Sequence, residues 1–141
     1  MPNKEFIKNK ISYIQKEVQV LSKYKNCSFE EIVSSFDKHT IAERILERII
    51  NDAIDINQHL ITEQGLKETP FDFKESFLLL AKLKVYPDKF AQEISKSVGL
   101  RNILVHQYRK LDEKIFYFSI KVCIRDYIKY CDYILKFLNK N

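Results

Sequence analysis

Hydrophobic residues recur along this chain at intervals of three and four, the spacing that places side chains on one face of an α-helix. The first such run spans residues 7–21 and predicts one long helix. A short helical turn is expected after Ser28, because Glu31 stands three residues later and completes a capping box. A second long helix is predicted from about Asp37 to Gln64, and Gly65 is a natural C-terminal stop. Its predicted core stripe consists of Ile41, Ile45, Leu46, Ile49, Ile56 and Leu60.

The second half of the chain continues this pattern with a loop and further helices. The segment LKETPFD, residues 66–72, is the clearest loop, and a shorter helix is predicted over about Phe73–Lys84. A fourth helix is expected to start at Pro87, which suits a first helical position, and to run into the stretch RNILVHQY, residues 101–108.

The last helix follows a break near residues 109–112, extends to about Leu138 and carries two apolar seams. One seam consists of Phe116, Ile120, Cys123, Tyr127, Tyr130, Ile134 and Phe137. The other consists of Ile124, Ile128, Cys131, Leu135 and Leu138. Because one seam is enough for a monomeric bundle, two seams predict either a central bundle helix or a helix that also forms a dimer contact.

The composition supports an all-α interpretation. Only two glycines and three prolines occur among 141 residues, too few for the many tight turns of all-β or doubly wound folds. The length fits a single domain, residues 1–141, and 45% of the residues are hydrophobic, enough to form a core. We therefore predict an all-α, up-and-down bundle of four to five helices.

Charge and cysteine usage limit the partners and the compartment. Lysine and arginine outnumber aspartate and glutamate by 24 to 19, and the resulting net charge of +5 favours a polyanion such as RNA. The three cysteines, Cys27, Cys123 and Cys131, show no CxxC spacing, so we expect reduced thiols and a cytoplasmic protein. The sequence has no charged-then-apolar leader and no run of about 18 apolar residues, so neither secretion nor a membrane contact is expected.

The stretch RNILVHQY concentrates polar side chains in one helix. On a wheel of about 100° per residue, Arg101 and Tyr108 fall within about 20° of each other, whereas His106 lies about 140° from Arg101. Arg101 and His106 can converge if the helix ends near Val105 and the chain turns back, or if two copies of the chain share one site. Gly99 favours the close approach of another backbone nearby.

These side chains suit the cleavage of RNA without a metal ion. Arg101 offers a planar, permanently charged fork that matches a phosphate group. Histidines titrate near neutral pH, so His106 can move the 2′-hydroxyl proton or protonate the leaving oxygen. Asn102 can orient either partner by hydrogen bonding. The spacing R-x4-H-x-Y also occurs in helices without any catalytic role, so a purely structural role stays open on this pattern alone.

The stretch SVGLRNILVHQY resembles the R-x4-6-H motif of the HEPN superfamily, in the R-x4-H-x-Y form of the HepT toxins. The segment AERILERIINDAIDINQHLITEQG, residues 42–65, is similar to the second helix of those proteins, and FDFKESFLLLAKLKV resembles their third. The resemblance spans roughly residues 40–138, and the part before it matches only in being helical.

This resemblance implies a homodimeric toxin of a type VII toxin–antitoxin system, acting as a metal-independent endoribonuclease without a cofactor. It implies that Arg101 and His106 are the catalytic pair and that Asn102 is their polar companion. The partner in that family is an MNT-type nucleotidyltransferase antitoxin, which attaches AMP to the motif tyrosine, here Tyr108.

Asp55 and His59 stand four residues apart, with Asp52 one turn earlier, and would share a helix face. They are expected either to line the active cleft or to form a solvated ion pair. Two or three ligands of this kind on an exposed face do not predict a metal site.

An alternative function is a non-catalytic helical module that binds RNA or a nucleotide, or that docks a nucleotidyltransferase. A purely docking surface has no need of a histidine close to an arginine, so the intact motif favours the nuclease. A neighbouring reading frame for a short nucleotidyltransferase would favour the toxin further.

Overall fold

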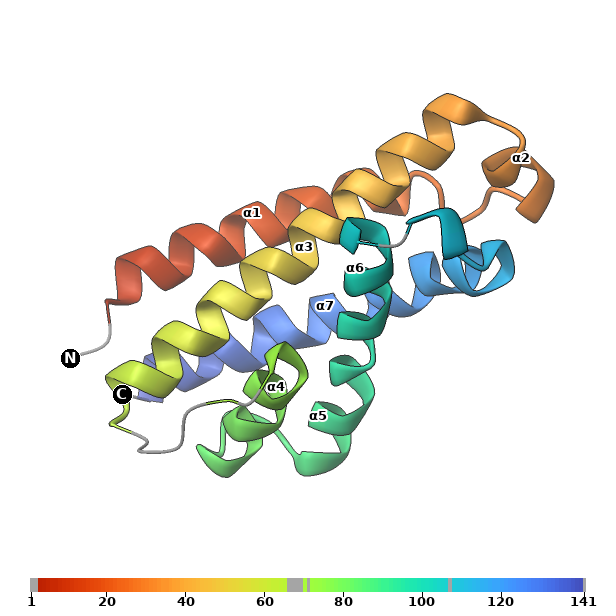
Figure 1. Ribbon diagram of the computed structural model, residues 1–141. Helices are drawn as coiled ribbons and strands as arrows, with labels where there is room; N and C mark the ends of the chain where they lie inside the picture. The colour runs from red at the N-terminus through yellow and green to blue at the C-terminus, as the bar shows by residue number, and fades with distance from the viewer. Residues whose placement is uncertain (1–2, 66–69, 71, 107, 141) are drawn as a thin grey trace.

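The computed structural model describes residues 3–65, 70, 72–106 and 108–140, and of Tyr108 it describes the backbone only. Within these residues the chain forms a bundle of helices (Figure 1). The elements are α1 (Lys4–Ser22), α2 (Phe29–Val33), α3 (Phe36–Glu63), α4 (Phe73–Lys82), α5 (Asp88–Ser95), α6 (Ser97–His106), the 3₁₀ helix η1 (Tyr108–Lys110) and α7 (Glu113–Lys140). The long helices α1, α3 and α7 lie side by side, and the short helices α4, α5 and α6 pack against one side of them (Figure 1). The predicted all-α bundle is confirmed.

The signals at the helix ends act as the sequence predicts. Ser28 Oγ accepts a hydrogen bond from the Glu31 backbone N–H at 3.1 Å, and Glu31 Oε1 accepts one from the Ser28 N–H at 3.0 Å, which completes the capping box of α2. Gly65, just beyond α3, has a φ of 69°, a left-handed conformation that glycine adopts without strain. Of the predicted loop, residues 66–69 and 71 lie outside the described residues. In the described part of the chain, no helix combines the length and the apolar character needed to cross a bilayer.

The core stripe of α3 is confirmed except at its first residue. Ile45, Leu46, Ile49, Ile56 and Leu60 are buried, but Ile41 is 43% exposed. Ala42 is fully buried instead, because the face of α3 that meets the neighbouring helices passes through Ala42 and Leu46 in this turn.

Both apolar seams of α7 serve the core of a single chain. The first seam is buried, with Phe137 partly so, and in the second seam only Ile128 is largely exposed, at 51%. This helix contacts α1, α2, α3, α5 and α6, so one chain covers it from several sides. The doubled seam therefore marks a central bundle helix and is no evidence for a dimer.

The cysteines of α7 are part of this core. Burial raises the pKa of the Cys123 thiol and that of the Cys131 thiol to about 12, so both stay neutral at neutral pH. Cys27 is half-buried, and all three are free thiols.

The helix predicted from Pro87 into the RNILVHQY stretch is interrupted at Lys96 and forms two helices, α5 and α6. Pro87 is the N-cap of α5, so the first helical residue is Asp88. The Ser95 and Ser97 hydroxyls donate hydrogen bonds to the backbone carbonyls of Gln92 and Ile94, three residues back. Serine side chains that compete for backbone groups in this way favour a break in a helix.

A buried chain of hydrogen bonds joins α7, α3 and α4. The Tyr130 hydroxyl donates to Asn57 Oδ1 at 2.6 Å, and Asn57 Nδ2 donates to Ser76 Oγ at 3.1 Å. Ser76 Oγ in turn donates to the Phe73 carbonyl oxygen at 2.6 Å. Asn57, Ser76 and Tyr130 are fully buried, so the chain fixes where α4 begins relative to the two long helices.

Replacing Asn57 by leucine should lower the free energy of unfolding by about 2 kcal/mol, because the Tyr130 hydroxyl and Ser76 would lose a partner away from water. Equilibrium denaturation in urea measures this change. The matched control is Gln58→Leu on the next, exposed position of α3, where a change within about 0.5 kcal/mol is expected. Equal effects at the two positions would contradict the role given to the buried chain.

Candidate active site

The RNILVHQY stretch covers the C-terminal end of α6 and the start of η1. His106 is the last residue of α6 and is exposed, whereas Arg101 lies one and a half turns earlier and is half-buried. Tyr108 begins η1, and its side chain lies outside the described part, as does Gln107. The helix therefore ends one residue later than Val105, the position considered from the sequence.

Arg101 is held on three sides. Its Nε donates a hydrogen bond to Asn51 Oδ1 of α3 at 2.8 Å, and its Nη1 donates one to Asn102 Oδ1 at 3.0 Å. Its Cζ lies 5.0 Å from the centre of the Phe73 ring, a cation–π contact with the first residue of α4. These bonds use two of the five guanidinium N–H groups, and among the described residues the other three have no hydrogen-bond partner, so a ligand can reach them.

A groove of about 640 Å³ between α4 and α6 contains Arg101, Asn102 and His106. Asp72, Phe73 and Lys74 form its α4 wall. The groove follows the exposed side of α6, so Arg101 and His106 both reach it even though they point apart on the helical wheel. Neither a turn of the chain nor a second copy is needed to bring them to one groove.

Gly99 gives this groove part of its width. Apart from its chain neighbours and the backbone of its own helix, a Cβ atom built at Gly99 would meet nothing within 4 Å, so no other described element approaches closely there. The backbone approach expected from the sequence is thus not found within one chain. Gly99 and Ile103 line the α4–α6 groove and also a neighbouring groove between α6 and α7.

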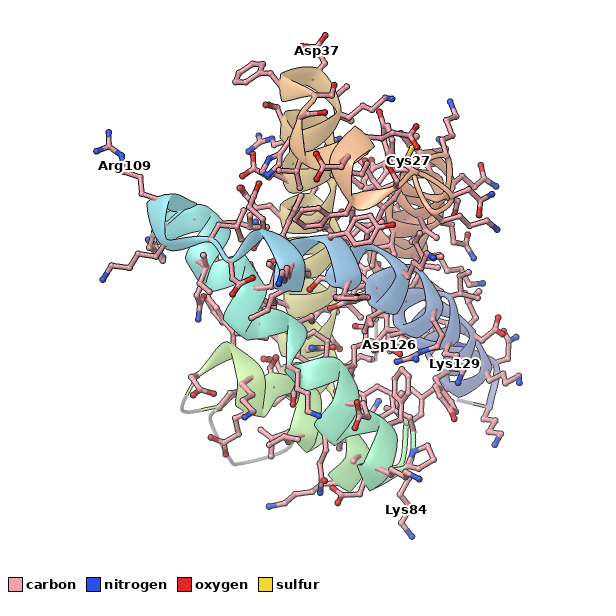
Figure 2. All side chains as sticks on the ribbon, turned by 90° about the vertical axis from the view of Figure 1, so that its right-hand side faces the viewer. Cys27, Asp37, Lys84, Arg109, Asp126 and Lys129 are labelled. Atoms are coloured by element: carbon pink, nitrogen blue, oxygen red, sulfur yellow. The ribbon has the colours of Figure 1, made fainter. Side chains whose placement is uncertain are left out.

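The surroundings of the groove are positively charged. Lys74 lines it, and Arg109 and Lys110 are exposed on η1, immediately after the motif. Figure 2 shows the Arg109 side chain directed away from the bundle at the edge of the molecule. Asp72 is the acidic residue of the groove, and its carboxylate caps α4 by accepting a hydrogen bond from the Glu75 N–H at 2.8 Å. The site therefore suits an anion such as a phosphate group.

Asp55 and His59 lie away from this groove and face α1. Lys10 Nζ bonds Asp55 Oδ2 at 3.1 Å and Asp52 Oδ1 at 3.3 Å. The His59 ring lies against Phe6, with ring centres 4.7 Å apart and the ring planes tilted by 33°. Asp55 thus forms its ion pair with Lys10 of α1, while His59 Nε2 lies 3.5 Å from Glu63 Oε1, and the described residues show no pair between Asp55 and His59. Neither residue is brought together with Arg101. No group of three or more histidine, cysteine, aspartate or glutamate residues that could hold a metal ion occurs in the part of the chain that the structure describes.

Asn51 and Phe73 complete the site, and the sequence alone indicates neither of them as part of it. They lie 50 and 28 positions before Arg101, and Phe73 occupies what the sequence shows only as a helix start. Asn51 is a polar residue on the long helix that carries the predicted core stripe, but its position in the sequence does not indicate a contact with Arg101.

Comparison with known proteins identifies related sequences. The profile of the family described as HepT-like, or ribonuclease HepT-like, matches residues 14–134. A tRNA nuclease HepT from Aphanizomenon flos-aquae (strain 2012/KM1/D3) is 32% identical over 132 residues, which cover 94% of this chain and 89% of the relative. An mRNA nuclease HepT from Shewanella oneidensis is 33% identical over 89 residues, which cover 63% of this chain and 66% of the relative.

Solved structures agree with the sequence relatives. The crystal structure of a toxin–antitoxin with AMP-PNP matches with a TM-score of 0.84 at 26% identity, covering 94% of this chain and 98% of that one. A tri-AMPylated Shewanella oneidensis HEPN toxin in complex with an MNT antitoxin matches with a TM-score of 0.83 at 26% identity, covering 96% and 99%. Since the family profile spans most of the chain and the fold agrees, the chain belongs to the HepT-like ribonuclease family.

Proposed function

We propose that this chain is the toxin of a toxin–antitoxin pair and an endoribonuclease that cuts RNA in the α4–α6 groove. The observation that carries the proposal is the groove itself, in which an anchored Arg101 and an exposed His106 line one surface. The nuclease relatives support the reaction class, and the complex of a HEPN toxin with an MNT antitoxin supports the pairing.

In this mechanism Arg101 holds the phosphate of the bond that is cut. The RNA 2′-oxygen attacks phosphorus, a P–O2′ bond forms, and the bond to the 5′-oxygen breaks. The 2′-hydroxyl gives up its proton and the 5′-oxygen gains one, which leaves a 2′,3′-cyclic phosphate and a 5′-hydroxyl. His106 performs one of these proton transfers, while Arg101 stabilises the charge that develops on the phosphate oxygens.

We also propose that the chain acts as a two-fold dimer, because each chain offers one motif histidine while the reaction needs a base and an acid. The α6–α7 groove, about 510 Å³, is lined by Gly99, Ile103, Ile115 and Val122, and it adjoins the catalytic groove at Gly99 and Ile103. Ile115 is 60% exposed and Val122 41% exposed, so a second copy seated here would bury apolar surface.

Control by the antitoxin is proposed to act through Tyr108, whose backbone lies two residues beyond His106. AMP joined to the Tyr108 hydroxyl would bring a phosphodiester with its negative charge close to the catalytic groove. That phosphate would compete with the RNA backbone for the Arg101 guanidinium, so inhibition would need no refolding of the bundle.

The catalytic assignment predicts that Arg101→Ala lowers the rate of RNA cleavage about a hundredfold, because a preorganised cation is lost. His106→Ala should be at least as damaging, and Asn51→Ala should cost about tenfold, since one anchor of the guanidinium is removed. Cleavage assays with end-group analysis measure these rates and the expected cyclic phosphate, in the presence of a chelator. Circular dichroism should show that all three variants are folded. RNA cleavage that survives in His106→Ala, or stops with chelator alone, would contradict the mechanism, and RNA binding without any cleavage would favour a non-catalytic module.

The dimer proposal predicts that sedimentation of the wild-type chain at micromolar concentration gives a dimer. The double variant Ile115→Asp/Val122→Asp should sediment as a folded monomer with strongly reduced cleavage, because two charges would have to be buried in the contact. As a matched control, Ile128→Asp places a charge on the exposed residue of the second α7 seam and should leave the dimer intact. A wild-type monomer would refute the proposal.

The control proposal predicts that co-expression with an MNT-type nucleotidyltransferase raises the mass of this chain by one or more AMP units. Peptide mapping should place them on Tyr108. The variant Tyr108→Phe should stay folded and toxic while escaping both modification and neutralisation. A Tyr108→Phe chain that the active transferase still neutralises would show that the switch lies on another residue.

A further inference from the structure

Another groove, of about 400 Å³, lies between α1 and α3 and carries exposed cations at its surface. Lys16 contributes from α1, and Arg44 and Arg48 contribute from α3. Lys10 also lines the groove, but it is only 23% exposed and is paired with Asp52 and Asp55. Tyr13 and Asn51 also line it. The proposed reaction as described above assigns no role to this groove.

In the two arginine ion pairs of this groove, the guanidinium is more exposed than the carboxylate. Arg48 Nη2 pairs with Glu17 Oε1 at 2.7 Å, but the arginine side chain is 57% exposed and the glutamate only 15%. Arg44 Nη1 pairs with Glu47 Oε2 at 3.1 Å, with 66% of the arginine and 23% of the glutamate exposed. The carboxylates therefore hold the guanidinium groups from below, and the remaining N–H donors face solvent. An approaching ligand meets mainly cations, which fits a phosphate backbone.

Two side chains of α1 add to this surface. Lys16 is exposed and makes no ion pair within the described residues. Tyr13 is 53% exposed, although most aromatic rings of this chain pack into the core. Because they are three positions apart, Tyr13 and Lys16 lie on neighbouring parts of one helix face. An exposed ring beside cations is the combination that binds an unpaired base together with its phosphate.

The α1–α3 groove is connected to the catalytic groove through Asn51. Asn51 lines the α1–α3 groove, and its Oδ1 accepts the 2.8 Å hydrogen bond from Arg101 Nε in the catalytic groove. A strand whose phosphate lies on Arg101 thus reaches the α1–α3 groove by passing over Asn51. In Figure 1, α3 runs between α1 on one side and α6 on the other, which agrees with this path.

We propose that the α1–α3 groove binds the single-stranded RNA that flanks the cut bond, with phosphates on Lys16, Arg44 and Arg48 and one base stacked on Tyr13. This inference rests on the proposed nuclease function. RNA is favoured over an acidic protein segment because the groove joins the catalytic groove and offers an exposed aromatic ring. The groove adds to the affinity for RNA, whereas the chemistry stays with Arg101 and His106.

The test uses Tyr13→Ala and Lys16→Glu in the full-length protein. Each should raise KM for a single-stranded RNA that the wild type cuts by about tenfold, while kcat changes less than about twofold. In a His106→Ala background, the Kd for a fluorescein-labelled oligouridylate, measured by anisotropy, should rise by a similar factor. Lys16→Glu should also reduce the slope of log Kd against log salt concentration by about one.

Two matched controls make the same chemical changes elsewhere. Phe36→Ala removes a ring that is 81% exposed at the start of α3, and Lys129→Glu reverses an exposed charge on α7. Figure 2 shows Lys129 beside Asp126 on α7, a helix that does not line the α1–α3 groove. Both controls should keep the wild-type Kd and KM.

The outcomes separate this inference from the proposed function. If Tyr13→Ala and Lys16→Glu bind the oligouridylate as tightly as the controls do, or if kcat falls while Kd stays unchanged, the inference is overturned. It is also overturned if both variants keep RNA binding but lose neutralisation by a nucleotidyltransferase, since the groove would then dock a protein. If the wild type cuts no RNA, the nuclease proposal fails, and the Kd values in the His106→Ala background still decide whether the groove binds RNA.

Discussion

The hydrogen bond from the Tyr130 hydroxyl to Asn57 Oδ1 lies at the centre of the bundle, where no water competes with it. Asn57 Nδ2 donates a hydrogen bond to Ser76 Oγ, and Ser76 Oγ donates one to the Phe73 carbonyl oxygen. The Tyr130 hydroxyl also lies 3.1 Å from the Ala53 carbonyl oxygen, so both of its acceptors belong to α3. The position of Phe73, and with it the start of α4, is therefore set by polar groups that are buried and hydrogen-bonded to one another. The Phe73 ring then supports the guanidinium of Arg101. A change in the core would thus be transmitted to the groove through a short, identifiable path.

Arg101 has uncharged partners, whereas Arg44 and Arg48 each pair with a carboxylate. Two amide oxygens and an aromatic ring hold it, and none of these carries a formal charge. Its full positive charge is therefore available to a ligand in the groove. Fixing a guanidinium in advance also reduces the side-chain entropy that binding would otherwise cost.

The sequence predicts the helices well because their signals are local. The spacing of Ile7, Ile11 and Ile14, the Ser28–Glu31 capping box and the glycine after α3 each act within a few residues. The prediction of one continuous helix fails at Lys96. The apolar periodicity continues from α5 into α6, but the serine hydroxyls there bond the backbone and the helix breaks.

The candidate site is only partly visible in the sequence, for the same reason. The motif places Arg101, Asn102 and His106 close together along the chain, and the structure puts them in one groove. Asn51 comes from a distant helix, and no periodicity indicates that it would meet Arg101. Asp55 lies one turn beyond Asn51 and is also polar, but it faces α1 and bonds Lys10. Position 55 is turned by about 40° from position 51 and lies about 6 Å further along α3, so the packing of the helices decides which of the two residues meets Arg101.

In the proposed binding of one polyanion the two grooves differ, because amide groups hold Arg101 while carboxylates hold Arg44 and Arg48. At Arg44 and Arg48 a carboxylate offsets most of the charge, so each exposed guanidinium attracts a phosphate weakly and is screened by salt. At Arg101 neutral amides leave the charge intact, in a half-buried position where screening is weaker. A strand lying across both would be held firmly at one phosphate and loosely along its flank. Firm binding along the whole strand would stabilise substrate and transition state equally and slow the release of the product, whereas a single strong cation acts where charge develops during cleavage.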